Sequence, residues 1–121
     1  MDIVKVNIVK VKIGKSTLRI KDCNGISSIR GLMFDSLQNY DGALIYANAI
    51  WMPFVKYGLD LVFLDKDFRV TDIQTAVPLT LHPKTWRIYS NDDAKYCLEI
   101  KAGKVRNLKT LVGKKIEFNN E

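Results

Sequence analysis

The strongest constraint in this sequence is the run Leu59–Leu64 (LDLVFL), which is apolar at both sets of alternating positions apart from one aspartate. Successive side chains of a strand point to opposite faces of a sheet, so such a run predicts a strand that is buried on both sides. A tight turn at residues 66–67 and a second run of strand character over residues 68–73 follow it. We therefore expect the fold to be organised around this buried strand.

Other parts of the chain also have the patterns of short strands. Residues 3–13 alternate, but the phase changes at Ile8 and Val9, which predicts a bulge or a strand that changes sheet. A turn at residues 14–15 leads into a strand over residues 16–21, whose basic side chains are expected to face outward. Further strands are expected at residues 42–46, 49–52, 85–89, 94–100 and 114–118, and short helical turns at 26–33 and 102–108.

These patterns, about nine short strands with one or two short helices, predict a mainly β fold. A chain of 121 residues is the size of one domain, so we expect residues 1–121 to form a single compact β-sandwich or barrel.

A series of short motifs recurs in order along the chain. They are R-G-L-M at residues 30–33, G-A-L-I at 42–45, W-M at 51–52, L-D at 59–60, P-L-T at 78–80 and Y-C-L-E-I-K-A-G at 96–103. Together they resemble the domain of unknown function family 192, an uncharacterised bacterial and archaeal family. Its members show R-G-L-M, G-M-L-F, W-M-x-N-T, P-L-D, P-L-T and Y-V-L-E-L-x-A-G. The resemblance covers about residues 15–118 and implies a compact β-barrel-like sandwich. This chain has Phe54 and Val55 where the family has N-T, and Gly58 where it has the proline of P-L-D.

Asp60 is a carboxylate in an otherwise apolar strand, so inside a fold it needs hydrogen bonds or an opposite charge. With Arg30 and Trp51 it forms a candidate ligand-binding pocket, in which Arg30 is an anion-binding residue. The alternative is structural: Asp60 accepts backbone N–H groups or pairs with Arg30, and Trp51 belongs to the core. In that case Asp60 and Arg30 matter more to stability than to activity.

A second candidate site lies in the segment T-W-R-I-Y. Strand alternation there places Trp86 and Ile88 on one face, and Arg87 and Tyr89 on the other. Together with Lys95, Arg87 and Tyr89 are candidate residues for stacking on and holding a single-stranded nucleic acid. The alternative is an ordinary solvated strand face.

The net charge of +6 is unevenly distributed along the chain. Residues 1–22 carry six basic and two acidic side chains and residues 95–115 carry seven and one, whereas residues 23–94 are slightly acidic. If the first and last strands are neighbours, these side chains form one basic face. Such a face predicts weak, salt-dependent binding of a polyanion such as nucleic acid or the ribosome. The alternative is that the charges maintain solubility and protect the sheet edges.

No catalytic or metal-binding arrangement emerges from the residue types. His82 is the single histidine, and Cys23 and Cys97 form no C-x-x-C motif, so zinc has no ligand set. We interpret both cysteines as buried free thiols, with a disulfide as the alternative. A Gly-rich phosphate loop and a nucleophile elbow are absent from the sequence, and no cofactor is expected. The leading hypothesis is therefore a small binding or interaction module without catalytic machinery. The rivals are a small-ligand protein or enzyme using the Asp60 pocket, and a weak electrostatic nucleic-acid binder.

The N-terminal residues alternate instead of forming the apolar core of a signal peptide. The longest apolar runs are also far shorter than the ~20 residues that span a bilayer. Many members of the resembling family carry export signals and this sequence shows none, so we expect a cytoplasmic protein. Two glutamines against fourteen lysines are typical of a thermophile, whereas eight asparagines are not.

Overall fold

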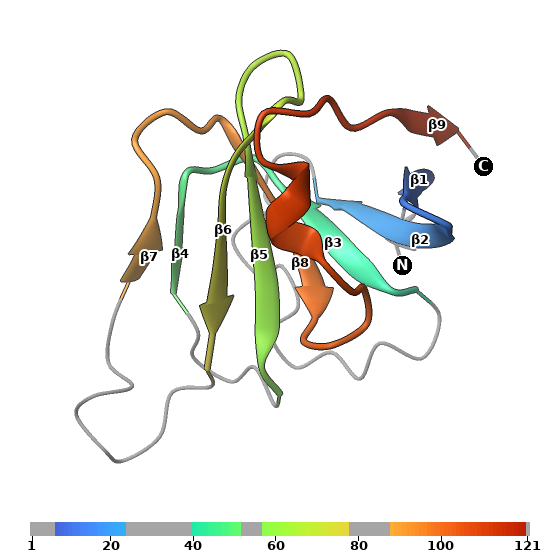
Figure 1. Ribbon diagram of the computed structural model, residues 1–121, viewed down its shortest axis with the longest axis horizontal. Coiled ribbons are helices and arrows are strands. Elements are labelled where there is room, and N and C mark those ends of the chain that lie inside the picture. The colour runs from blue at the N-terminus through green and yellow to red at the C-terminus, as the bar shows by residue number, and fades with distance from the viewer. Residues whose placement is uncertain (1–6, 24–39, 52–56, 78–87, 121) are drawn as a thin grey trace, which may run out of the picture.

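The computed structural model describes residues 7–23, 40–51, 57–77 and 88–120, and these residues are mainly β. The strands in this part of the chain are β1 (Asn7–Ile13), β2 (Ser16–Cys23), β3 (Gly42–Ile45), β4 (Ala49–Trp51), β5 (Leu59–Leu64), β6 (Val70–Ala76), β7 (Ile88–Ser90), β8 (Tyr96–Lys101) and β9 (Phe118–Asn120). A short 3-10 helix, η2 (Leu108–Leu111), precedes β9 (Figure 1). The prediction of a mainly β fold with about nine short strands is confirmed.

Seven of the described strands form one mixed sheet in the order β6-β5-β8-β3-β2-β1-β9, and β4 pairs with β7 in a separate ribbon. The strand pairs of the large sheet are antiparallel except β2 and β3, which run parallel. Strands β6 and β9 lie at its two edges, so the sheet is open and is not a closed barrel. Because β1 pairs with β9, the first and last described strands lie side by side (Figure 1).

Strand β5 is buried on both faces of this sheet, as its apolar pattern predicts. Leu59, Leu61 and Phe63 pack into a core on one face. Val62 and Leu64 pack into a second core on the other face. All five side chains have no exposed surface, which explains why neither set of alternating positions in the run is polar apart from Asp60.

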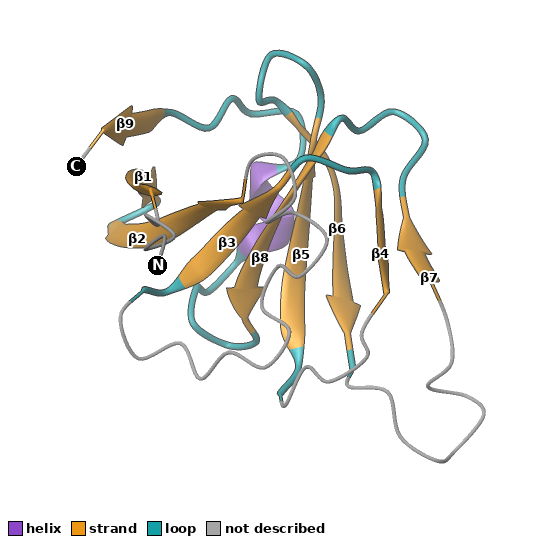
Figure 2. Ribbon diagram, turned by 180° about the vertical axis from the view of Figure 1, so that it is seen from behind, coloured by secondary structure: helices purple, strands orange, loops and turns teal. Residues whose placement is uncertain are grey.

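Different parts of the chain cover the two faces. The β4–β7 ribbon covers the first, where Ile50 and Tyr89 join the core formed by β5. The segment after β8 covers the second with Leu108 and Ile116. Figure 1 shows η2 in front of β5 and β8, and the view from behind in Figure 2 places it beyond those strands. The sheet is therefore the middle layer of the described structure.

Two predictions of local structure near the chain ends are wrong. Strand β1 pairs with β2 in an uninterrupted register over Asn7–Ile13, so their pairing contains no bulge at Ile8 and Val9. Residues 102–108 do not form the expected helical turn, because the short helix begins only at Leu108. The helical turn expected at residues 26–33 lies outside the described residues.

The predicted orientation of β7 is also wrong. Ile88 is 65% exposed and Tyr89 is 2% exposed, which is the reverse of the expected arrangement. Tyr89 is buried together with its hydroxyl group, whose oxygen accepts a hydrogen bond from the backbone N–H of Val77 at 3.1 Å. A tyrosine with such a partner can occupy a core position.

Both cysteines are buried thiols that form no disulfide, as expected. Cys23 and Cys97 both lie opposite Ile45, one on each side of β3, so a whole strand separates them. Burial raises the pKa of the Cys97 thiol well above its usual range, and the nearby charge of Glu99 adds to this effect. The thiol therefore stays protonated and is a poor nucleophile.

Candidate functional site

Asp60 lies half-buried in β5, on the face that the segment after β8 covers. Its Oδ1 accepts a hydrogen bond from the Thr75 hydroxyl at 3.3 Å, and its Oδ2 accepts one from the Gly103 backbone N–H at 3.2 Å. Strand β4, which ends at Trp51, packs against the opposite face. The sheet therefore separates Asp60 from β4, and Arg30 lies outside the described residues. The contacts of Asp60 are those of the structural anchor considered as its alternative role.

Replacing Asp60 with asparagine is expected to lower the free energy of unfolding by about 1–2 kcal/mol. The asparagine has one oxygen where the aspartate has two. If this oxygen accepts from the Thr75 hydroxyl, the amide NH₂ faces the N–H of Gly103, and both are donors. In either orientation the charged acceptor is lost. Chemical denaturation of Asp60→Asn measures the change. The control is Asp92→Asn on an exposed turn, expected to change stability by less than about 0.5 kcal/mol. Equal stability of the two variants would contradict the anchoring role.

The structure buries a different carboxylate more deeply. Glu99 is 3% exposed, and it is the one charged side chain classed as buried among the described residues. It lies in β8 directly between Ala43 of β3 and Leu61 of β5, on the face of the first core. Glu99 was not among the predicted site residues, although the signal that identified Asp60, an acid in an apolar strand, is equally present in C-L-E-I.

The outward face of the β1–β2 hairpin is basic. Lys10 lies directly opposite Arg19 across the strand pair, and Lys12 lies two residues further along β1. Directly opposed side chains share a face, so these three exposed cations point to the same side. We call this set (Lys10, Lys12 and Arg19) the hairpin face. Strand β9 adds the uncharged Asn119 opposite Lys10.

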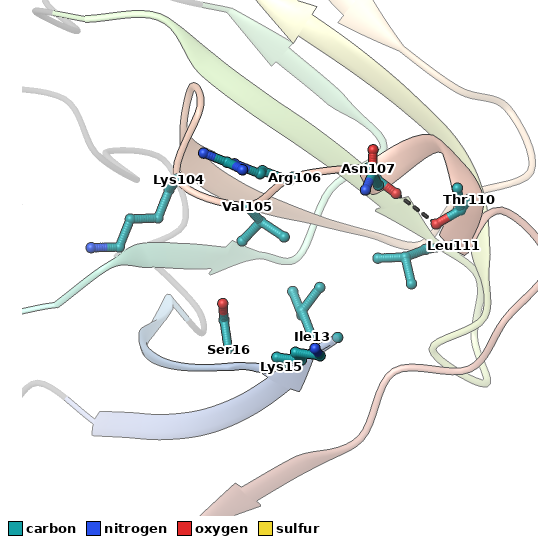
Figure 3. A pocket seen from close by; sticks show the side chains of 10 residues that line it. Ile13, Lys15, Ser16, Lys104, Val105, Arg106, Asn107, Thr110 and Leu111 are labelled. Carbon is teal, nitrogen blue, oxygen red and sulfur yellow. Dashed lines mark hydrogen bonds between the residues drawn. The ribbon is translucent and has the colours of Figure 1, made fainter.

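A pocket of about 490 Å³ opens at the end of the same hairpin (Figure 3). It is lined by residues of the β1–β2 turn and of the segment after β8: Ile13, Gly14, Lys15, Ser16, Lys104, Val105, Arg106, Asn107, Thr110 and Leu111. Figure 3 shows Val105 and Leu111 pointing from the later segment towards Ile13 of the hairpin. We call this the turn pocket.

Three basic residues are among those that line the turn pocket. Lys15, Lys104 and Arg106 line it, and no acidic side chain does so in the described part of the chain. Asp41 does not line the pocket, but it forms an ion pair with Lys104, with 3.3 Å between Oδ1 and Nζ. The Oδ2 atom of Asp41 also accepts the backbone N–H of Arg19 at 2.9 Å, which ties this ion pair to β2.

The wall opposite the hairpin is shaped by a turn at Asn107. This residue has a φ of 59°, in the left-handed region that asparagine tolerates better than most residues. Its carbonyl oxygen accepts both the hydroxyl of Thr110 at 2.6 Å and the backbone N–H of Thr110 at 3.1 Å. These two bonds hold the beginning of η2 beside the pocket.

The sequence of this chain matches one family over most of its length. The family model DUF192, described as Uncharacterized ACR, matches residues 14–118. The chain belongs to the DUF192 family. The match includes every residue that lines the turn pocket except Ile13, and it begins after β1.

Three relatives resemble this DUF192 chain. A UPF0127 protein from Thermococcus sibiricus is 28% identical over an alignment of 123 positions, which covers 96% of this chain and 75% of the relative. A crystal structure from Sinorhizobium meliloti, described as a candidate transcription regulator, has a TM-score of 0.71 and 21% identity over 94% of each chain. A protein of unknown function from Novosphingobium aromaticivorans has a TM-score of 0.62 and 21% identity, covering 96% of this chain and 84% of the other. At these identities the two structures show a shared fold.

Two of the motifs that indicated the DUF192 family meet in the structure. The L-D motif contains Asp60, and the Y-C-L-E-I-K-A-G motif ends at Gly103, whose backbone N–H donates to the Asp60 carboxylate. Gly103 has a φ of +83°, which favours glycine at this turn. The bond connects the end of β8 to β5 on the face that the C-terminal segment covers.

The residues predicted to stack on nucleic acid do not form a described surface. Lys95 is exposed, Arg87 lies outside the described residues, and Tyr89 is buried in the core. Tyr89 is therefore not accessible for stacking on a base. The described residues also contain no group of three or more histidine, cysteine or acidic side chains placed to hold a metal ion. No helix in this part of the chain is long and apolar enough to cross a membrane.

Proposed function

We propose that this protein is a single-domain, cytoplasmic, non-catalytic binding module that holds nucleic acid by its phosphates. The observation that carries the proposal is the hairpin face, where Lys10, Lys12 and Arg19 project together from a rigid strand pair. Strand β9, which pairs with β1 at the edge of the sheet, adds no charge of its own to this face.

The spacing of the hairpin face suits phosphate contacts. Side chains two residues apart on one strand are separated by about 7 Å, and directly opposed residues by about 5 Å. Three such cations contact successive phosphates without reading the edges of the bases. The expected binding is therefore weakly selective for sequence and sensitive to salt. Each neutralised phosphate of a single strand contributes about −0.7 to the slope of log affinity against log salt, so three contacts give roughly −2.

Two further observations favour nucleic acid as the partner. The net charge of +6 attracts polyanions over several ångströms. One protein of similar fold, from Sinorhizobium meliloti, is described as a candidate transcription regulator. The competing explanation, that these charges only keep the protein soluble, predicts no binding even at low salt.

The test is a titration of a fluorescently labelled oligonucleotide at low and moderate salt, followed by anisotropy. We expect Lys12→Glu to weaken binding roughly tenfold at low salt and to make the salt slope shallower by about one. The matched control is Lys66→Glu, which makes the same charge change at an exposed lysine in the β5–β6 turn and is expected to have a much smaller effect. Lys95→Glu tests the site predicted from the sequence in the same way.

Three outcomes would overturn the proposal. They are an absence of binding at low salt, an effect of Lys66→Glu as large as that of Lys12→Glu, and binding that persists at high salt with a strong sequence preference.

A further inference from the structure

We propose that the turn pocket binds a small organic phosphate, namely a phosphate monoester with an apolar body. The inference is independent of the nucleic-acid proposal, because none of the three residues of the hairpin face lines the pocket. It combines three properties of the pocket: its size, its charge and the separation of its apolar and basic parts.

The size of the pocket suits a small molecule. Its volume of about 490 Å³ lies within the range of roughly 300–1,000 Å³ that is usual for small-ligand sites. A concave site of this size with basic lining residues suits a compact anion.

The charge of the pocket matches a dianion. The side chains of Lys15, Lys104 and Arg106 supply three positive charges, and Asp41 neutralises one of them at Lys104, which leaves a local charge of two positive. A phosphate monoester carries about −1.5 to −2 at neutral pH. The planar fork of Arg106 can donate two hydrogen bonds to two phosphate oxygens, and this geometry favours phosphate over a simple halide ion.

The apolar part of the pocket explains why inorganic phosphate alone is not the best ligand. Val105 and Leu111 are half-buried beside the buried Ile13, so part of their apolar surface is in contact with water between the hairpin and the later segment. A ligand body that covers this surface removes it from water, which favours binding. The hydroxyl of Ser16 and the side chain of Asn107 line the same pocket and can orient the ligand.

The positions of the basic groups are partly fixed before a ligand arrives. Asp41 holds Lys104 at 3.3 Å and is itself bonded to the backbone of β2. The two hydrogen bonds from Thr110 to the Asn107 carbonyl oxygen hold the opposite wall. A site with fixed walls loses less conformational entropy on binding.

The test uses phenyl phosphate as the probe and the full-length protein labelled with ¹⁵N. Backbone amide signals are followed by NMR during titrations with phenyl phosphate, inorganic phosphate and benzyl alcohol, which separate the contributions of the charge and the apolar body. We expect phenyl phosphate to shift the signals of the β1–β2 turn and of residues 104–111. We expect inorganic phosphate and benzyl alcohol each to bind at least tenfold more weakly.

Variants identify the site. Arg106→Gln is expected to weaken phenyl phosphate binding roughly tenfold or more, since it removes a charged hydrogen-bond donor. The matched control is Lys109→Gln, an exposed cation on η2 that does not line the pocket, and it is expected to change affinity less than twofold. Signals far from the pocket report whether each variant is folded.

The proposal is overturned if phenyl phosphate leaves the pocket signals unchanged, or if Arg106→Gln binds it as tightly as the wild type. Equal affinity for inorganic phosphate or for benzyl alcohol would also overturn it. Lys12→Glu distinguishes the two proposals: it is expected to keep phenyl phosphate binding while losing affinity for the oligonucleotide. Loss of both in Lys12→Glu would place the phosphate on the hairpin face and would contradict the turn pocket.

Discussion

Replacing Glu99 with alanine is expected to lower the free energy of unfolding by about 2–5 kcal/mol, as for other large-to-small substitutions in a core. The carboxylate is 3% exposed and lies between two apolar strands, so water does not solvate it in the folded protein. A buried carboxylate persists in a fold only where hydrogen bonds or an opposite charge compensate for the lost water. Truncation to alanine removes the interactions of this side chain and opens a cavity in the core of the sheet.

Urea denaturation followed by tryptophan fluorescence measures this effect. Glu117→Ala removes the same side chain from an exposed position and is expected to change stability by less than about 0.5 kcal/mol. Glu99→Gln keeps the shape and removes the charge, so it separates electrostatic stabilisation from packing. If Glu99→Ala unfolds at the same urea concentration as Glu117→Ala, the assignment of a structural role to this buried acid is wrong.

Replacing Gly42 with alanine is expected to destabilise the protein by about 3 kcal/mol, because it forces two central strands apart. A Cβ atom on Gly42 would overlap the backbone carbonyl oxygen of Glu99 and lie 3.2 Å from its carbonyl carbon and 3.3 Å from the Cα of Ile100. The obstacle is the backbone of β8, which is hydrogen-bonded on both sides and cannot rotate away as a side chain can. The melting temperature is expected to fall by roughly 10 °C or more.

Gly14 provides the control for this substitution. It lies in the β1–β2 turn with a φ of +58° and has no atom within 4 Å of the added Cβ, so Gly14→Ala meets only the backbone strain of the left-handed region. That strain is about 1–2 kcal/mol. If thermal denaturation shows Gly42→Ala to be no less stable than Gly14→Ala, the close approach of β3 to β8 is incorrect.

The two buried or half-buried acids show how far residue patterns predict a role. An acid in an apolar strand indicates that the carboxylate has specific partners, and this signal is present at both Asp60 and Glu99. The signal does not say which carboxylate lies deeper. Asp60 lies on the face that the segment after β8 covers and accepts the Gly103 N–H, whereas Glu99 lies on the opposite face between Ala43 and Leu61. The segments that cover the two faces therefore decide how deeply each carboxylate is buried.

The orientation of β7 illustrates the same limit. Alternation in the segment R-I-Y establishes that neighbouring side chains face opposite ways, but it does not establish which set faces inward. Ile88 and Tyr89 both have apolar surface to bury. The position of the β4–β7 ribbon on the sheet decides that Tyr89 is buried. The Val77 N–H that donates to the Tyr89 hydroxyl comes from the residue directly after β6, which is distant from β7 in sequence.

The sequence by itself determined the mainly β fold, the doubly buried strand at Leu59–Leu64 and the basic β1–β2 hairpin. These features depend on residue periodicity over a few positions, which is a local property of the chain. Only the tertiary structure decided the order of the strands, the parallel pairing of β2 with β3 and the formation of the turn pocket. These depend on contacts between segments far apart in sequence, such as the β1–β2 turn and residues 104–111, and local periodicity carries no information about which distant segments meet.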